Sequence, residues 1–141
     1  MNSFYQKWMT LWCAGVALFG LILAAGAFAA TDGLCRAVFM LFGNPIPAVP
    51  DDLHRFAIGL MGAVTFGWGA TLFVGIKAFH LLPAAQAAPL WRQTVVAASL
   101  WYVIDSIISV ATGYGMNAVS NTLFMVLLLV PVVRSGVMRA G

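Results

Sequence analysis

Asp105 is the residue with the clearest chemical potential in this sequence, because it lies inside the apolar stretch 101–112. A carboxylate near the centre of a membrane helix costs about 2.5–3.5 kcal/mol on insertion scales. It therefore faces the interior of a helix bundle, finds polar partners or takes up a proton. No basic residue of any span is available to pair with it, so a neutral, protonated carboxyl group fits this position.

Helical spacing places further polar side chains on the face of Asp105. A tight turn at Gly113-Tyr114-Gly115 would fold the next span back, so that asparagines of that span reach similar depths. We expect one polar cluster that opens toward the outer face, with Thr122 at its edge. Its predicted members are Tyr102, Asp105, Ser109, Thr112, Asn117 and Asn121.

Three roles fit this cluster. The simplest is structural, because interhelical hydrogen bonds worth about 0.6 kcal/mol each would join the two helices. In the second, Asp105 carries a proton, coordinates a cation or orients a polar group of a ligand. In the third, the cluster meets a partner protein.

Small residues mark the second predicted span, where Gly67, Thr71 and Gly75 repeat every four positions. Such a stripe lets helices approach closely. Packing within the chain's own bundle is the simplest interpretation, and a homodimer or docking to another subunit is the alternative. The residues predicted to pack or dock are Gly59, Gly62, Gly67, Thr71 and Gly75.

Metal and cofactor chemistry finds little support. His54 and His80 lie about 39 Å apart by helical rise, so they cannot share a haem or metal site, and ligation by either one alone is a weak alternative. Cys13 and Cys35 lie about 30 Å apart and cannot form a disulfide. No Cys/His cluster has metal-ligand spacing. We predict no metal and no cofactor, although a bound lipid, quinone or pigment is compatible with the sequence.

Catalysis is equally unsupported, because no serine or cysteine has a histidine nearby in sequence and glutamate is absent. We predict no catalytic residues and, more generally, a protein that is not an enzyme.

The composition, 62% hydrophobic and 8% charged, is typical of proteins solvated by lipid. About 20 apolar residues are needed for each crossing, and backbone groups in lipid must pair within helices. We therefore predict a single all-α membrane domain over residues 1–141, a bundle of four transmembrane helices. The predicted spans are residues 8–30, 53–79, 93–112 and 116–133.

The segments between the spans carry their own signals. A short interfacial helix is expected at about 33–43, followed by an extended stretch through Pro45 and Pro47. Asp51 and Asp52 then provide a helix start. Pro83 and Pro89 bracket an expected loop. Residues 27–29 imitate a signal-peptide cleavage site, but we treat the first apolar segment as a true span.

Basic residues flank the spans unevenly. The outer side holds Arg36 and Arg55 together with three aspartates. The positive-inside rule then places both termini in the cytoplasm. The scattered charges give no reason to expect a nucleic-acid partner. The cations of the opposite side are Lys7, Lys77, Arg92, Arg134 and Arg139.

The composition resembles that of small four-helix membrane proteins of the bacterial inner membrane, and no individual family is indicated. Our first functional hypothesis is a non-enzymatic accessory subunit of a larger membrane complex, of the respiratory or photosynthetic kind. A small transporter or channel that uses Asp105 is the alternative, and lipid, quinone or isoprenoid binding is the third. The expected partners are membrane lipids and either other membrane subunits or further copies of the chain.

Overall fold

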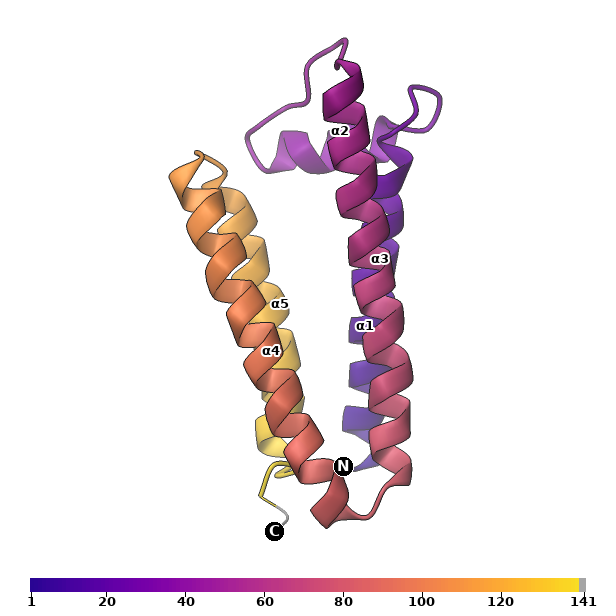
Figure 1. Ribbon diagram of the computed structural model, residues 1–141, viewed down its shortest axis with the longest axis vertical. Helices are drawn as coiled ribbons and strands as arrows, with labels where there is room; N and C mark the ends of the chain where they lie inside the picture. Colours follow the sequence, from indigo (N-terminus) through magenta and orange to yellow (C-terminus); the bar gives the residue numbers. More distant parts are fainter. Residues whose placement is uncertain (140–141) are drawn as a thin grey trace. The chain divides into compact units, whose positions relative to one another are not determined.

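The structure, a computed structural model, describes residues 1–139 and contains no strand within them. Four of its helices are long and apolar enough to cross a membrane, which suggests a multi-pass membrane protein and confirms the all-helical prediction. The helices, shown in Figure 1, are α1 (Ser3–Ala25), α2 (Gly33–Leu41), α3 (Asp52–Leu81), α4 (Ala84–Ala111) and α5 (Gly115–Arg134).

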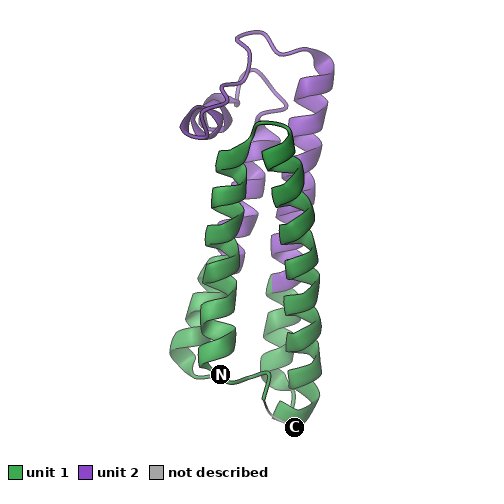
Figure 2. Ribbon diagram, turned by 90° about the vertical axis from the view of Figure 1, so that its left-hand side faces the viewer, with its two compact units in different colours: residues 1–12, 73–141 green, residues 13–72 purple. Residues whose placement is uncertain are grey.

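The chain divides into two compact units (Figure 2). Unit 1 comprises Met1–Trp12 and Phe73–Gly141, and unit 2 comprises Cys13–Leu72. Helices α1 and α3 therefore each contribute one part to each unit, whereas α4 and α5 belong wholly to unit 1.

In unit 2, α1 and α3 approach so closely that their backbones touch. A Cβ atom built on Gly62 would collide with the backbone nitrogen of Ala24, and one on Gly20 with that of Phe66. A Cβ atom on Gly69 would lie 2.7 Å from the backbone nitrogen of Ala17. Only residues with little or no side chain allow this contact.

The glycines in this contact differ from the predicted stripe. Gly59 and Gly62 take part, but Gly67 and Thr71 are exposed, and no atom of residues 1–139 lies within 4 Å of a Cβ atom built on Gly67. The contact instead continues to Gly69. Side chains that line a seam between two antiparallel helices recur every three or four residues in alternation, and a strict four-residue repeat drifts off that seam.

Hydrogen bonds and ion pairs of Asp32, Arg36 and Arg55 stabilise the segment between α1 and α3. Arg36 donates to the carbonyl of Pro47 at 2.9 Å and pairs with Asp32 at 2.9 Å, while Arg55 lies 3.5 Å from the same carboxylate. The hydrogen bond from Arg36, together with the charges of both arginines, holds the pKa of Asp32 below its ordinary value. The ion pairs therefore persist at neutral pH, while the hydrogen bond from Arg36 to Pro47 anchors α2 to the extended segment.

The helix starts in this region agree with the sequence. Asp51 accepts a hydrogen bond from the backbone N–H of His54 at 2.8 Å, which pairs one of the free donors of the first turn of α3. This bond also lowers the pKa of Asp51. The helix α2 occupies the region expected at about 33–43, and its position at a membrane surface stays a prediction.

Two boundaries differ from the predicted spans. The first helix ends at Ala25, because Gly26 and Ala27 bond to carbonyls only three residues back and tighten the chain into turns. The loop expected between Pro83 and Pro89 is helical from Ala84 onward. Pro89 removes only one backbone hydrogen bond there, and the alanines around it have the highest helix propensity.

In unit 1, α4 and α5 form the predicted antiparallel hairpin (Figure 1). The chain reverses at Gly113, whose φ of +86° is readily adopted only by glycine. The amide of Tyr114 closes the turn by donating to the carbonyl of Ser109 at 2.7 Å. The two helices therefore run side by side from the turn onward.

Two tryptophans of α1 donate hydrogen bonds to the backbone of α5. Pro131 has no N–H, so the carbonyl of Leu127, four residues earlier, lacks its usual helical donor. The indole N–H of Trp8 donates to this carbonyl at 2.9 Å, and that of Trp12 to the carbonyl of Phe124 at 3.1 Å. Trp8 thus replaces the missing amide.

The contact between α1 and α3 predicts opposite effects for two glycines of the same helix. Gly62→Ala should lower the free energy of unfolding by about 1–3 kcal/mol, because the new methyl group overlaps the backbone of Ala24. Gly67→Ala meets open space and should be neutral or stabilise by up to about 1 kcal/mol. Unfolding of the purified variants in detergent measures both. Equal losses at the two sites would contradict the packing described.

The bond between Trp8 and Leu127 predicts a coupling with Pro131. Trp8→Phe should destabilise the protein by about 1–3 kcal/mol, since it leaves the partly buried carbonyl of Leu127 unpaired. In a Pro131→Ala background residue 131 supplies an amide, and the loss should shrink. Trp12→Phe is the matched control, because Leu128 already provides an N–H for the carbonyl of Phe124. A double-mutant cycle measures the coupling, and the same Trp8→Phe loss in both backgrounds would refute it.

Candidate functional site

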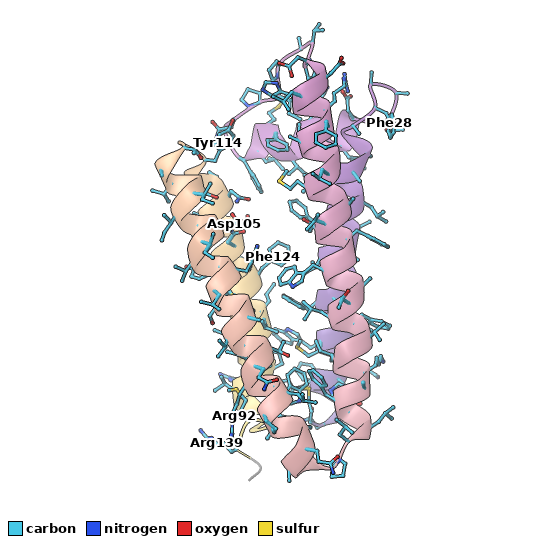
Figure 3. All side chains as sticks on the ribbon, in the orientation of Figure 1. Phe28, Arg92, Asp105, Tyr114, Phe124 and Arg139 are labelled. Atoms are coloured by element: carbon cyan, nitrogen blue, oxygen red, sulfur yellow. The ribbon has the colours of Figure 1, made fainter. Side chains whose placement is uncertain are left out.

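Four of the six residues predicted to cluster around Asp105 meet between α4 and α5. Asp105 and Ser109 come from α4, one helical turn apart, and Asn117 and Asn121 come from α5, also one turn apart. Figure 3 shows Asp105 in the upper half of the hairpin, toward the turn at Tyr114. We call these four residues the Asp105 cluster.

All the side-chain hydrogen bonds in which Asp105 takes part end on one carboxylate oxygen, Oδ1. Asn117 donates to it at 2.8 Å and Asn121 at 2.9 Å, each from the side-chain amide. The hydroxyl of Ser109 lies 3.1 Å from Oδ1 and 2.7 Å from the backbone carbonyl of Asp105, so its single proton is shared between them. Oδ1 thus faces three neutral donors.

Asn117 links the members of the cluster to one another. Its amide nitrogen is 2.8 Å from Oδ1 of Asp105 and 2.8 Å from the hydroxyl of Ser109. Because the amide carries two hydrogens, both bonds form at once, and the Ser109 oxygen serves as donor and acceptor. The cluster therefore joins α4 to α5 through side chains alone.

The other two predicted members lie outside this network. Tyr102 bonds to Thr122 at 3.0 Å. The hydroxyl of Thr122 also donates to the carbonyl of Ala118, so Tyr102 is the donor in this pair. Thr112, the residue that follows α4, bonds to the carbonyls of Ile108 and Ser109 in the last turn of that helix. A hydroxyl satisfied by its own backbone has no donor left for Asp105.

The cluster is sheltered and has no basic partner. Ser109 is 5% exposed and Asn121 4% exposed, while Asp105 is partly buried. Within residues 1–139 no lysine or arginine pairs with Asp105, and no hydrogen bond reaches its second oxygen, Oδ2. The arrangement can therefore take up a proton or a small cation at Oδ2, or a hydrogen bond from a ligand.

Sequence reasoning did not single out Ser106. Its hydroxyl is buried and has no hydrogen-bond partner within the described residues. It follows Asp105 directly in the chain, so the three- and four-residue spacing that located the other members does not reach it. A serine among apolar residues beside an intramembrane carboxylate is the only signal that could have marked it.

The histidines occupy separate places, as expected from their positions in α3. The ring nitrogen Nδ1 of His54 lies 2.8 Å from the carboxylate of Asp51. His80 packs its ring 5.9 Å from that of Trp91, and its Nε2 atom is buried without a partner in the described part of the chain. No group of three metal-binding side chains gathers anywhere in residues 1–139.

Comparison with protein-family models, with curated proteins and with solved structures finds no match to this chain. The chemistry of the Asp105 cluster consequently has to be inferred from its own geometry. That geometry combines a carboxylate, three neutral donors on one oxygen and an apolar helix on either side.

Proposed function

We propose that the chain is a multi-pass protein of the bacterial inner membrane whose α4–α5 hairpin binds a proton or a small cation at Asp105, as part of a small carrier or channel. The observation that carries this proposal is the convergence of three neutral donors on Oδ1, with no basic residue paired to the carboxyl group. An ionisable group inside a membrane helix is a candidate functional site by default.

The donors hold the carboxyl group in one orientation and leave Oδ2 for the bound ion. A proton or a monovalent cation there would complete the charge balance that the hairpin's own residues do not supply. Because only neutral groups surround the site, its charge would change on binding and on release, which is what a transport step requires. A quinone or isoprenoid ligand with a hydroxyl group is the competing occupant.

The proposed orientation follows from the charged residues. Helices α4 and α5 turn at Gly113, and the side with more cations lies at the opposite end of the hairpin, where Arg92 and Arg134 are found. Both termini would then be cytoplasmic, and the Asp105 cluster would lie in the outer half of the membrane with α2 at its outer surface.

The first test is the loss of transport when Asp105 becomes neutral. Asp105→Asn keeps the shape of the side chain, but it can neither ionise nor neutralise a cation, so proton- or cation-driven flux into proteoliposomes should be abolished. Thr112→Val is the matched control, since the Thr112 hydroxyl bonds only within α4. It should leave the flux within about twofold of wild type. Unchanged flux in Asp105→Asn would remove this residue from the mechanism.

A second candidate function is that of an accessory subunit in a larger membrane complex. The observation that favours it is the open face of α3, where Gly67 and Thr71 are exposed and no atom of the described residues lies within 4 Å of a Cβ position on Gly67. Small residues of this kind permit close contact with a helix of another subunit. The same face would also accept a second copy of the chain.

This candidate predicts that extraction in a mild detergent yields a species larger than the 15.0 kDa chain, with partner subunits that co-purify. Gly67→Leu should release the partners by filling the open face. Gly15→Leu is the control, because Gly15 is another exposed helical glycine with nothing within 4 Å of its Cβ position. Recovery of the wild-type chain alone and monomeric would exclude this function.

A further inference from the structure

One end of unit 1 collects positive charge without any acidic residue to balance it. The only carboxylate side chain of unit 1 is Asp105, which lies about 20 Å along α4 from Arg92 by helical rise. None of the cations forms an ion pair within the described residues. All five are exposed, and they are Lys7, Lys77, Arg92, Arg134 and Arg139. We call them the cationic end.

Contacts between the helices place these residues at the same end of unit 1. The ring of Phe79, near the end of α3, meets Trp91, near the start of α4, at 5.3 Å. Trp8, next to Lys7, bonds to Leu127, about two turns before Arg134 in α5. Figure 2 shows the N-terminus and the C-terminal part of the chain at this end.

Arg92 and Arg139 are brought together by a neutral contact. Two nitrogens of the Arg92 guanidinium group donate to the carbonyl of Met138, at 2.9 and 2.6 Å. This bond places the backbone that precedes Arg139 against the Arg92 side chain, and Figure 3 shows both residues toward the same end of the chain. Both cations therefore belong to the same end of unit 1, and within residues 1–139 no carboxylate pairs with either of them. An external anion is the partner that such an arrangement fits.

Aromatic residues at the same end indicate what kind of anion this is. In the first two turns of α1 the ring of Phe4 contacts those of Tyr5 and Trp8, and Phe4 is 61% exposed. Aromatic side chains of this kind gather where a membrane helix reaches the headgroup layer. In a membrane, this position would bring the cationic end to the depth of lipid phosphates.

We propose that the cationic end is a binding surface for the phosphate groups of anionic phospholipids. The guanidinium groups of Arg92 and Arg139 supply paired donors for phosphate oxygens, and Arg134, Lys7 and Lys77 add charge around them. The rings of the first turns of α1 pack beside the acyl chains. This surface is separate from the Asp105 cluster, so it does not depend on the proposed cation site.

The test uses the full chain in vesicles of phosphatidylglycerol or of phosphatidylcholine, followed by extraction and native mass spectrometry of the lipids that stay bound. The wild-type protein should retain phosphatidylglycerol in preference to phosphatidylcholine. Each exposed cation near the headgroups adds about fivefold to that preference. In the double variant Arg134→Gln/Arg139→Gln this preference should fall roughly 25-fold. Arg92 is left unchanged, because it bonds to the carbonyl of Met138.

Two controls separate charge from structure. The variant Arg134→Lys/Arg139→Lys keeps both charges and should retain most of the preference. Raising the salt to about 1 M shortens the screening length to about 3 Å and should reduce the preference of the wild type. Equal retention of the two lipids by the wild type, or equal preference in the wild type and the double Gln variant, would overturn the proposal. Either result leaves the flux test on Asp105 unaffected.

Discussion

Inside a long apolar helix an unpaired polar group is costly, and this cost explains how most polar side chains of the four long helices are paired. Most hydroxyl groups meet it locally: Thr10, Thr65, Thr94, Ser99 and Thr122 each donate to the carbonyl four residues back. Asp105 cannot do so, because a carboxylate needs donors and the helix's own N–H groups are already used. The side chains of Ser109, Asn117 and Asn121 supply these donors, and they thereby fix α4 against α5.

The number of long helices and the hairpin turn could be predicted from sequence, because apolar length and glycine spacing act locally. The helical stretch around Pro89 could not, since the helix propensity of the flanking alanines outweighs one lost hydrogen bond there. The contact between α1 and α3 was located only in part. The four-residue repeat predicts a contact at Gly67. The observed contact between α1 and α3 instead follows an alternation of three and four residues through Gly62 and Gly69.

The candidate site shows the same division. Spacing within one helix and a tight turn are enough to propose that Asp105, Ser109 and Asn121 lie near one another, and the structure brings them together. Spacing does not reveal which hydroxyl groups already donate to a backbone carbonyl. Thr112 shares the face of Asp105, but its own backbone takes its proton. Conversely, the isolated hydroxyl of Ser106 appears only when burial is known. The competition between local and interhelical partners is a three-dimensional property.

The bond between Trp8 and Leu127 also bears on the order in which the protein assembles. During synthesis α1 is made before α3 and α4, and α5 follows them. The bond between the Trp8 indole and the Leu127 carbonyl can therefore form only after almost all of the described chain has been synthesised. Until α5 packs against α1, the carbonyl of Leu127 has neither an amide nor an indole donor. The pairing of α1 with α5 is therefore a late closing step, and a chain truncated before α5 would leave Trp8 with no acceptor there.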